Sequence, residues 1–218
     1  MNAIRQIINQ AKSQANTQEK LNVFLQKRRP LLHSSILLPQ NQDVKPLVDF
    51  VDRYISHVPD FIEAIKTIIQ EAQIENEVQP ILTVAANYFL SPPDLIKENS
   101  DLLALLDESY LAHRLLEEVN DRFMAKTGIP LTPMDNTIAN LIAHELIGEP
   151  FANLLDQAVL FSAELLLNEN KMESESIRDY IETHKNRGWS DEIKRWPCLA
   201  DKLAIRFEFS EPQASQLH

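Results

Sequence analysis

Glycine is scarce in this sequence, and its scarcity removes whole classes of function. The 218 residues contain only 3 glycines, at positions 128, 148 and 188. Loops that cradle phosphate groups need several glycines close together, as in Walker-type nucleotide-binding proteins and in the dinucleotide fingerprint of Rossmann folds. The sequence therefore excludes both of these nucleotide-binding motifs. The Gly-x-Ser-x-Gly motif of serine hydrolases is also missing.

Cysteine is rarer still, since Cys198 is the single one. One thiol cannot build a disulfide framework or a cysteine-rich zinc site within one chain. It follows Trp196 and Pro197 with no patterned histidine nearby, so we interpret it as a buried, unreactive thiol. This cysteine usage is typical of a reducing compartment.

Long hydrophobic runs are missing as well. The longest strongly apolar stretch, residues 80–90, is about half the length that a bilayer-spanning helix needs. Residues 1–10 alternate polar and apolar side chains and residues 12–20 are strongly polar, unlike a secretory leader. We therefore expect a cytoplasmic protein without a transmembrane segment.

Positive charge is in short supply, because the formal net charge is -11 at pH 7. This balance argues against nucleic-acid binding by the body of the protein. Residues 1–30 are the exception, with six basic residues against one glutamate. We expect this basic segment to pack on the acidic remainder of the chain or in a dimer. Contact with anionic lipid or with nucleic acid is less favoured, since the apolar stripe is thin and rich in Gln and Asn neighbours.

Apolar residues recur every three to four positions through most of the chain, which predicts helices. One helix is expected from residue 43 to 58, and Pro59 and Asp60 then restart the chain into a second helix. Pro80 is expected to begin a third helix, which has apolar residues on all sides and should lie at the centre of the bundle. The prolines at 92 and 93 end it.

The later helices have clear boundary signals. A long helix is expected over residues 101–126, ended by Gly128 and Pro130. The next should run from a cap at Asp135 or Asn136 to residue 148, and Pro150 should open another over 151–168. Short connections between many helices predict an all-α, compact multi-helix bundle.

We divide the chain into four segments. Residues 1–38 form a basic amphipathic helical segment, 39–169 the bundle core, 170–209 a small C-terminal helical appendage packed on the core, and 210–218 a disordered tail. Within the appendage, residues 205–209 alternate with period two and predict a lone extended segment. Trp189 and Trp196 lie among basic residues, but Asp191 and Glu192 interrupt them, so we expect the tryptophans to anchor the appendage.

The middle of the chain resembles a known family. Tyr88-Phe-Leu-Ser-Pro-Pro-Asp-Leu-Ile-Lys-Glu98 and, further on, Leu105-Leu-Asp-Glu108 are similar to the YkvA-like family, bacterial domains of unknown function. Its pattern is an apolar helix ending in Tyr, then Pro-x-Asp-Leu-Ile-Pro-Asp, then an Asp-Asp pair opening the next helix. Lys97 replaces a family proline, and Glu98 and Glu108 each stand for an Asp. The resemblance covers residues 80–120 and implies an all-helical fold and an acidic cluster, but no reaction.

That acidic cluster is one candidate metal site. Asp94, Glu98, Asp107 and Glu108 offer the oxygen ligands that Mg²⁺ or Ca²⁺ prefers. The favoured interpretation is structural, with Asp94 capping a helix start and Asp107 solvated on the polar side of its helix.

A second candidate metal site involves histidine. His113 and Glu117 have i, i+4 spacing, and Glu145 lies on the apolar stripe of another helix. The Glu-x-x-His motif of di-iron bundles is absent from the sequence, which leaves a mononuclear site from these three residues. A boundary histidine paired with a nearby carboxylate is the favoured alternative, and His144 is expected near the surface.

These patterns contain no recognisable catalytic motif. We therefore predict a bacterial helical protein that acts by binding a protein partner or by self-association as a homodimer. One alternative is a metal-binding protein or metal-dependent enzyme that holds a divalent ion in one of the two candidate sites. The other is a peripheral membrane protein that binds lipid through residues 1–30.

Overall fold

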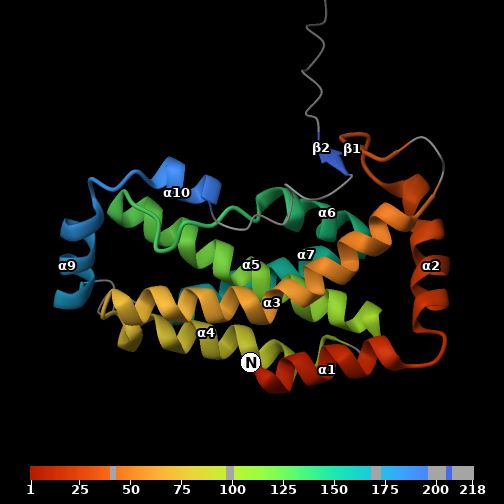
Figure 1. The fold of residues 1–218 in the computed structure, drawn as a ribbon, viewed down its shortest axis with the longest axis horizontal. Coiled ribbons are helices and arrows are strands. Elements are labelled where there is room, and N and C mark those ends of the chain that lie inside the picture. Colours follow the sequence, from red (N-terminus) through yellow and green to blue (C-terminus); the bar gives the residue numbers. More distant parts are fainter. Residues whose placement is uncertain (40–42, 97–100, 168–172, 196–204, 208–218) are drawn as a thin grey trace, which may run out of the picture.

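The protein is a bundle of α-helices, as the hydrophobic periodicity predicts (Figure 1). The structure is a computed structural model that describes residues 1–39, 43–96, 101–167, 173–195 and 205–207. Its α-helices are Asn2–Ser13 (α1), Thr17–Arg28 (α2), Lys45–Glu71 (α3), Glu75–Leu90 (α4), Leu102–Thr127 (α5), Thr137–Ile147 (α6), Phe151–Leu166 (α7), Glu175–His184 (α9) and Trp189–Arg195 (α10). A short 3-10 helix, Arg29–Leu31 (η1), follows α2.

The helix α5 forms the centre of the bundle. It packs against α3, α4, α6 and α7 and also contacts α1 and α2. Its start is capped by Asp101, whose side chain accepts hydrogen bonds from the backbone N–H groups of Leu103 and Ala104. It ends at Gly128, whose φ of 80° is a left-handed conformation that glycine adopts without strain. Both expected boundaries of this helix are confirmed.

Two proline predictions are wrong. Pro59 does not restart the chain, because α3 runs without interruption from Lys45 to Glu71 and contains it. The proline removes one backbone hydrogen bond, and the helix bends near its middle (Figure 1). Apolar residues on both sides of it, among them Val58 and Ile62, stay buried in the core. Burial along the whole helix outweighs the lost bond.

The second wrong prediction concerns α4, which begins at Glu75 and contains Pro80 near its start. Pro80 is the sixth residue of α4, so it removes the backbone hydrogen bond to the Asn76 carbonyl. The helix continues through it nevertheless, with Ile81, Leu82 and Ala85 buried beyond it. The central position expected for this helix belongs to α5, since α4 packs on α5, α3 and α1 and exposes Leu90 at its end.

The basic N-terminal helix packs on the body of the same chain. Ile4, Ile8 and Ala11 of α1 are buried, and Arg5 forms ion pairs with Asp60 (2.7 Å) and Glu63 (2.6 Å) of α3. Lys12 likewise pairs with Asp52 of α3 at 2.6 Å, on the same side of the bundle. Among the described helices, none has the length and apolar character to cross a bilayer.

The helix α9 lies at one end of the bundle and packs through Ile177 and Tyr180 (Figure 1). The Tyr180 hydroxyl donates to the Leu131 carbonyl at 2.8 Å. Trp189 is partly buried against the hydrophobic core, and its indole N–H donates to the His184 carbonyl within the same segment. Trp196 and Cys198 lie outside the described residues, as do residues 210–218.

The extended segment near the C-terminus is paired, which corrects the expectation of a lone strand. Arg206–Phe207 (β2) pairs antiparallel with Ile36–Leu37 (β1), and Ile36 lies opposite Phe207. Two segments far apart in the sequence thus form a short antiparallel pair. A period-two pattern predicts an extended segment but not which other segment it pairs with.

Candidate functional site

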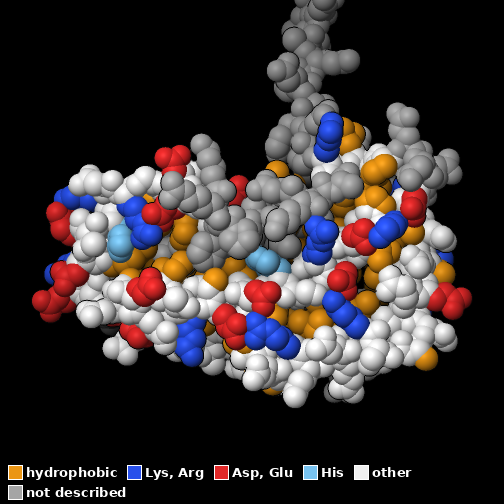
Figure 2. Space-filling view, in the orientation of Figure 1, with side chains coloured by type: hydrophobic (Ala, Val, Ile, Leu, Met, Phe, Trp, Pro, Cys, Tyr) orange, Lys and Arg blue, Asp and Glu red, His pale blue; other side chains and the backbone are white. Residues whose placement is uncertain are grey.

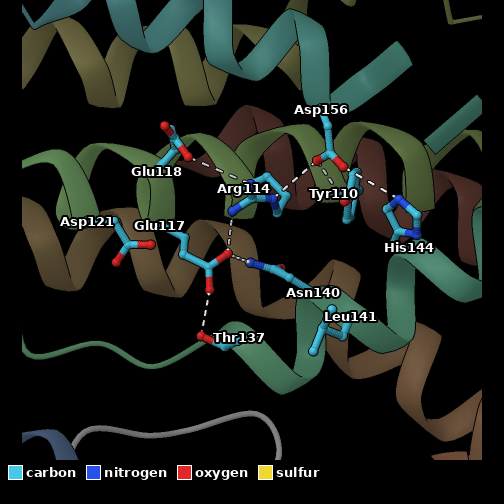
Figure 3. A pocket seen from close by; sticks show the side chains of 10 residues that line it. All are labelled: Tyr110, Arg114, Glu117, Glu118, Asp121, Thr137, Asn140, Leu141, His144 and Asp156. Atoms are coloured by element: carbon cyan, nitrogen blue, oxygen red, sulfur yellow. Dashed lines mark hydrogen bonds and ion pairs between the residues drawn. The ribbon is translucent and has the colours of Figure 1, made fainter. Parts of the chain in front are cut away.

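A polar pocket opens between the central helix α5 and the pair α6 and α7 (Figure 3). Its volume is about 380 Å³, within the range of small-molecule sites. The lining residues come from all three helices, and most of them are charged or polar: Tyr110, Arg114, Glu117, Glu118, Asp121, Thr137, Asn140, Leu141, His144 and Asp156.

Arg114 stands at the centre of this pocket and connects two of its walls. Its Nη1 lies 2.6 Å from an oxygen of Glu117 on the same helix, and its Nε lies 3.2 Å from an oxygen of Asp156 on α7. Hydrogen bonds between ionised groups are shorter and stronger than neutral ones, and here they are partly withdrawn from water. The guanidinium therefore holds α5 and α7 together as well as shaping the pocket.

Glu117 is fixed by donors from three directions. Besides Arg114, it accepts hydrogen bonds from the Thr137 hydroxyl (2.9 Å) and the Asn140 amide (2.7 Å) of α6. The Tyr54 hydroxyl of α3 donates to the Asn140 side-chain oxygen at 2.6 Å. This bond orients the Asn140 amide so that its NH₂ group points to Glu117. The carboxylate is 8% exposed and its charge is well compensated by these donors.

Asp156 of α7 accepts hydrogen bonds on the opposite wall of the pocket from Glu117. The Tyr110 hydroxyl donates to it at 2.8 Å, and His144 Nε2 lies 3.5 Å away. Burial raises the pKa of Tyr110, and the neighbouring Asp156 charge raises it further, so the phenol stays protonated as a donor. His144, expected near the surface, is only partly exposed and also approaches Asn153 of α7 at 3.2 Å.

Two further carboxylates, Glu118 and Asp121, face the pocket. Glu118 accepts from Arg122 at 2.7 Å and is 3.8 Å from Arg114. Asp121 forms no hydrogen bond or ion pair with any residue that the structure describes, and partial burial together with Glu117 and Glu118 raises its pKa. In Figure 3 its side chain stands apart from the hydrogen-bonded network. Four carboxylates thus line the pocket against one guanidinium.

The structure does not bring the predicted set His113, Glu117 and Glu145 together. His113 is fully buried, with Nε2 3.1 Å from the Tyr54 carbonyl, and burial lowers its pKa to about 3. Glu117 faces the polar pocket, whereas Glu145 accepts from the His33 backbone N–H at 3.1 Å. Across the described ranges, no three His, Cys, Asp or Glu side chains form a group that would hold a metal ion.

His113 therefore also departs from the favoured alternative of a boundary histidine beside a carboxylate. Its ring packs among those of Tyr54, His57 and Phe61 in the core. The imidazole is neutral there, because charging it would require a buried cation without a counter-ion.

The acidic set near the start of α5 is only partly described. Asp94 is exposed in a turn, rather than capping a helix, and Glu98 lies outside the described residues. Asp107 is partly buried, so the expectation that it is solvated is wrong, and burial, followed by the Asp101 charge, raises its pKa to about 7. Burial, followed by the Asp107 charge, raises the pKa of Glu108 to about 8. One oxygen of Glu108 is buried without a hydrogen-bond partner.

Sequence reasoning missed most residues of the polar pocket. Of its lining, only Glu117 was a candidate, while Arg114, Tyr110 and Asp156 were not considered. One signal was available, because Arg114, Glu118 and Arg122 follow one another at i, i+4 spacing and predict a ladder of ion pairs along one side of α5.

Comparison of the chain with family models, curated proteins and solved structures finds no match in any of the three. The similarity to the YkvA-like family therefore stays a prediction, and the function is argued from the geometry of the pocket.

Proposed function

We propose that the protein acts by binding, and that its polar pocket takes a small organic cation such as a primary amine or a guanidinium compound. The observation that carries this proposal is the charge around a cavity of about 380 Å³. Four carboxylates line it against Arg114, and Arg122, outside the lining, pairs with one of them, Glu118. These carboxylates range from the buried Glu117 to the exposed Asp121. Their excess lowers the local potential, which favours a positively charged ligand.

Asp121 is the expected anchor for the charged end of the ligand. Its carboxylate has no partner among the described residues, and the nearby charges of Glu117 and Glu118 oppose its ionisation. An ammonium group has three donors and one charge, so it would relieve this repulsion through charge-assisted hydrogen bonds. Leu141, which is 39% exposed, offers an apolar surface for an alkyl chain on the same ligand.

Arg114 favours an organic cation over a metal ion. Its guanidinium lies between Glu117 and Asp156 and already occupies oxygens of both carboxylates. A divalent ion at the same oxygens would have to displace it, because two cations that close repel each other strongly. An organic ammonium held at Asp121 and Glu118 leaves the Arg114 contacts in place.

Isothermal titration calorimetry tests the proposal with agmatine, putrescine and spermidine as probes and with acetate as an anionic control. We expect binding of at least one amine and none of acetate. Asp121→Asn should weaken that binding at least about 10-fold, the effect of removing one charge-assisted hydrogen bond. Asp179→Asn is the matched control, because it makes the same substitution at an exposed aspartate of α9 that does not line the pocket.

Two results would count against an organic cation. Equal weakening by both substitutions would mean that the amines respond to the overall negative charge and not to the pocket. Binding of Mg²⁺ or Mn²⁺ that competes with the amines and disappears in Asp121→Asn would assign the pocket to a metal ion instead.

A further inference from the structure

His144 lies between two neighbouring cavities. It projects from α6 and lines the polar pocket. It also lines a second cavity of about 300 Å³, which Arg28 and Glu149 border as well. In Figure 3 its ring lies at the opposite end of the labelled residues from Asp121. The His144 side chain is 20% exposed, so protons from solvent reach its ring.

Two oxygens near Nε2 determine where the His144 ring carries its hydrogen. Nε2 lies 3.2 Å from the side-chain oxygen of Asn153 and 3.5 Å from Oδ2 of Asp156. Amide and ionised carboxylate oxygens accept hydrogen bonds and do not donate them, so Nε2 carries a hydrogen in the neutral ring. Nδ1 is then the nitrogen that gains a proton when the ring becomes charged. His144 therefore gains a positive charge without giving up either contact.

The two oxygens of Asp156 differ in how fully they are used. Oδ1 accepts from the Tyr110 hydroxyl at 2.8 Å and from Arg114 Nε at 3.2 Å. Among the described residues, His144 alone makes a polar contact to Oδ2. At 3.5 Å that contact is longer than an ordinary N–H···O hydrogen bond. Oδ2 is thus the oxygen of Asp156 that remains open to another donor.

We propose that His144 makes the polar pocket sensitive to pH, because the neutral ring permits an organic cation to bind and the charged ring opposes it. This inference rests on the proposed function, since it concerns the same pocket and the same class of ligand. The charged ring pairs with Oδ2 of Asp156, which removes that oxygen as an acceptor for the ligand. It also adds a second cation to a lining in which four carboxylates face Arg114. Histidine ordinarily changes charge between pH 5 and pH 8, so amine binding weakens across this range as pH falls.

Charged groups from several elements surround the His144 ring. Acidic groups favour its charged form, and basic groups oppose it. The acidic groups are Asp156 of α7, Glu145 and Glu149 beside the second cavity, and Glu117, Glu118 and Asp121 in the polar pocket. The basic groups are Arg114 of α5 and Arg28 of α2. The Tyr110 ring meets the His144 ring edge to face at 6.1 Å and stays uncharged, since burial raises its pKa. Acidic groups are therefore in excess around the ring.

Asp121 contributes a second pH dependence with the same sign. Partial burial, followed by the charges of Glu117 and Glu118, raises the pKa of Asp121. As pH falls, protonation of either Asp121 or His144 makes the pocket less negative and weakens the binding of an amine. A substitution at His144 is therefore needed to separate the two contributions.

Calorimetric titration with agmatine from pH 5 to pH 8 makes this separation, since agmatine keeps both of its charges throughout this range. Wild-type protein should bind agmatine at least about 10-fold more weakly at pH 5 than at pH 8. His144→Gln keeps an N–H donor for Asp156 but cannot become charged, so its change should be about 3-fold or less. His184→Gln is the matched control, because it makes the same substitution at a histidine of α9 that does not line the pocket. It should keep the wild-type dependence.

An NMR titration of the free protein adds a measurement that needs no ligand. The signal of the His144 ring, identified by its loss in His144→Gln, should titrate between pH 5 and pH 8. Saturating agmatine should move its midpoint to lower pH, because a ligand that prefers the neutral ring opposes protonation by the same factor.

The outcomes distinguish this inference from the proposed function. Agmatine binding with the same pH dependence in wild type and His144→Gln would overturn the inference and leave the proposed function intact. A His144 signal that does not titrate between pH 5 and pH 8 would overturn the inference as well. No amine binding at any pH would overturn the proposed function itself, and the inference with it.

Discussion

Two pairs of adjacent acidic residues on α5 have opposite electrostatic surroundings. Asp107 and Glu108 lie near the start of the helix, and Glu117 and Glu118 lie further along it. Burial raises the pKa of Asp107 to about 7 and that of Glu108 to about 8. Glu117, by contrast, is only 8% exposed but accepts hydrogen bonds from Arg114, Thr137 and Asn140.

The difference follows from the residues one helical turn away. Positions three and four before and after Asp107 and Glu108 hold Leu, Ala and Tyr110, and none of these is a cation. Glu118 has Arg114 and Arg122 four residues away on either side, and Glu117 has Arg114 three residues before it. Neighbours at this spacing share a face of the helix. Burial is therefore compensated by protonation at Asp107 and Glu108, and by neighbouring arginines at Glu117 and Glu118.

The largest expected effect on stability comes from removing Arg114, the cation beside Glu117 and Glu118. Arg114→Ala should lower the free energy of unfolding by about 4 kcal/mol, because Glu117 and Asp156 would keep partly buried charges without their counter-ion. Urea unfolding at pH 7 measures this loss. Arg122→Ala is the control, since the Arg122 side chain is more exposed than that of Arg114 and, among the described residues, pairs with Glu118 alone. This substitution should cost about 0.5 kcal/mol. Equal losses would contradict the central role of Arg114.

A smaller effect, a gain in stability, is expected from removing the ionisable group of Glu108. Glu108→Gln should raise the free energy of unfolding by about 2 kcal/mol at pH 8, since the amide never has to ionise while buried. The pKa of Glu108 rises from 4.5 in the unfolded chain to about 8 in the fold. The folded state therefore binds more protons than the unfolded state, and wild-type stability falls as pH rises between these two values.

Thermal unfolding of wild type and Glu108→Gln between pH 5 and pH 8 measures this dependence. The advantage of the variant should be small at the lower pH and grow toward the upper one, as the unfolded glutamate ionises first. An advantage that is constant across the range would show that Glu108 does not titrate as described. Asp179→Asn, at an exposed position of another helix, is the control substitution.

The smallest expected effect concerns Asp101, where two substitutions distinguish the role of its charge from its role as the cap of α5. Asp101→Ala should cost about 1 kcal/mol, because its carboxylate caps α5 through the N–H groups of Leu103 and Ala104. Asp101→Asn keeps an oxygen acceptor at the cap and removes the charge that raises the pKa of Asp107. Its unfolding free energy, measured in urea, should stay within about 0.5 kcal/mol of wild type. A loss as large as that of the alanine variant would contradict this separation.

The helices were predictable from the sequence wherever local signals and packing agree. The ends of α5 are the clearest case, since Asp101 and Gly128 have local roles that need no tertiary contact. The predicted restart at Pro59 failed because a proline rule counts one lost hydrogen bond, whereas burial along all of α3 decides the outcome.

The polar pocket was much less predictable. Arg114 and Glu117 lie within one turn of each other, and a search for ion pairs along α5 would have found them. Asp156 and Asn140 come from other helices, and their partners depend on how those helices are rotated and placed. His113 shows that local spacing can also mislead. Its i, i+4 spacing with Glu117 predicted that the two side chains bind one metal ion, but the His113 ring is buried against Tyr54 instead.

The all-helical class, the caps and the alternation of cationic and acidic residues on α5 are local properties, and they can be deduced from neighbours within about one turn. Which acidic side chains gather around Arg114, and which face of α7 remains exposed, depended on the packing of α5, α6 and α7. The physical reason is that an apolar stripe specifies that a helix must be buried, but not against which partner or at what rotation. Those choices come from the sum of contacts across the whole bundle.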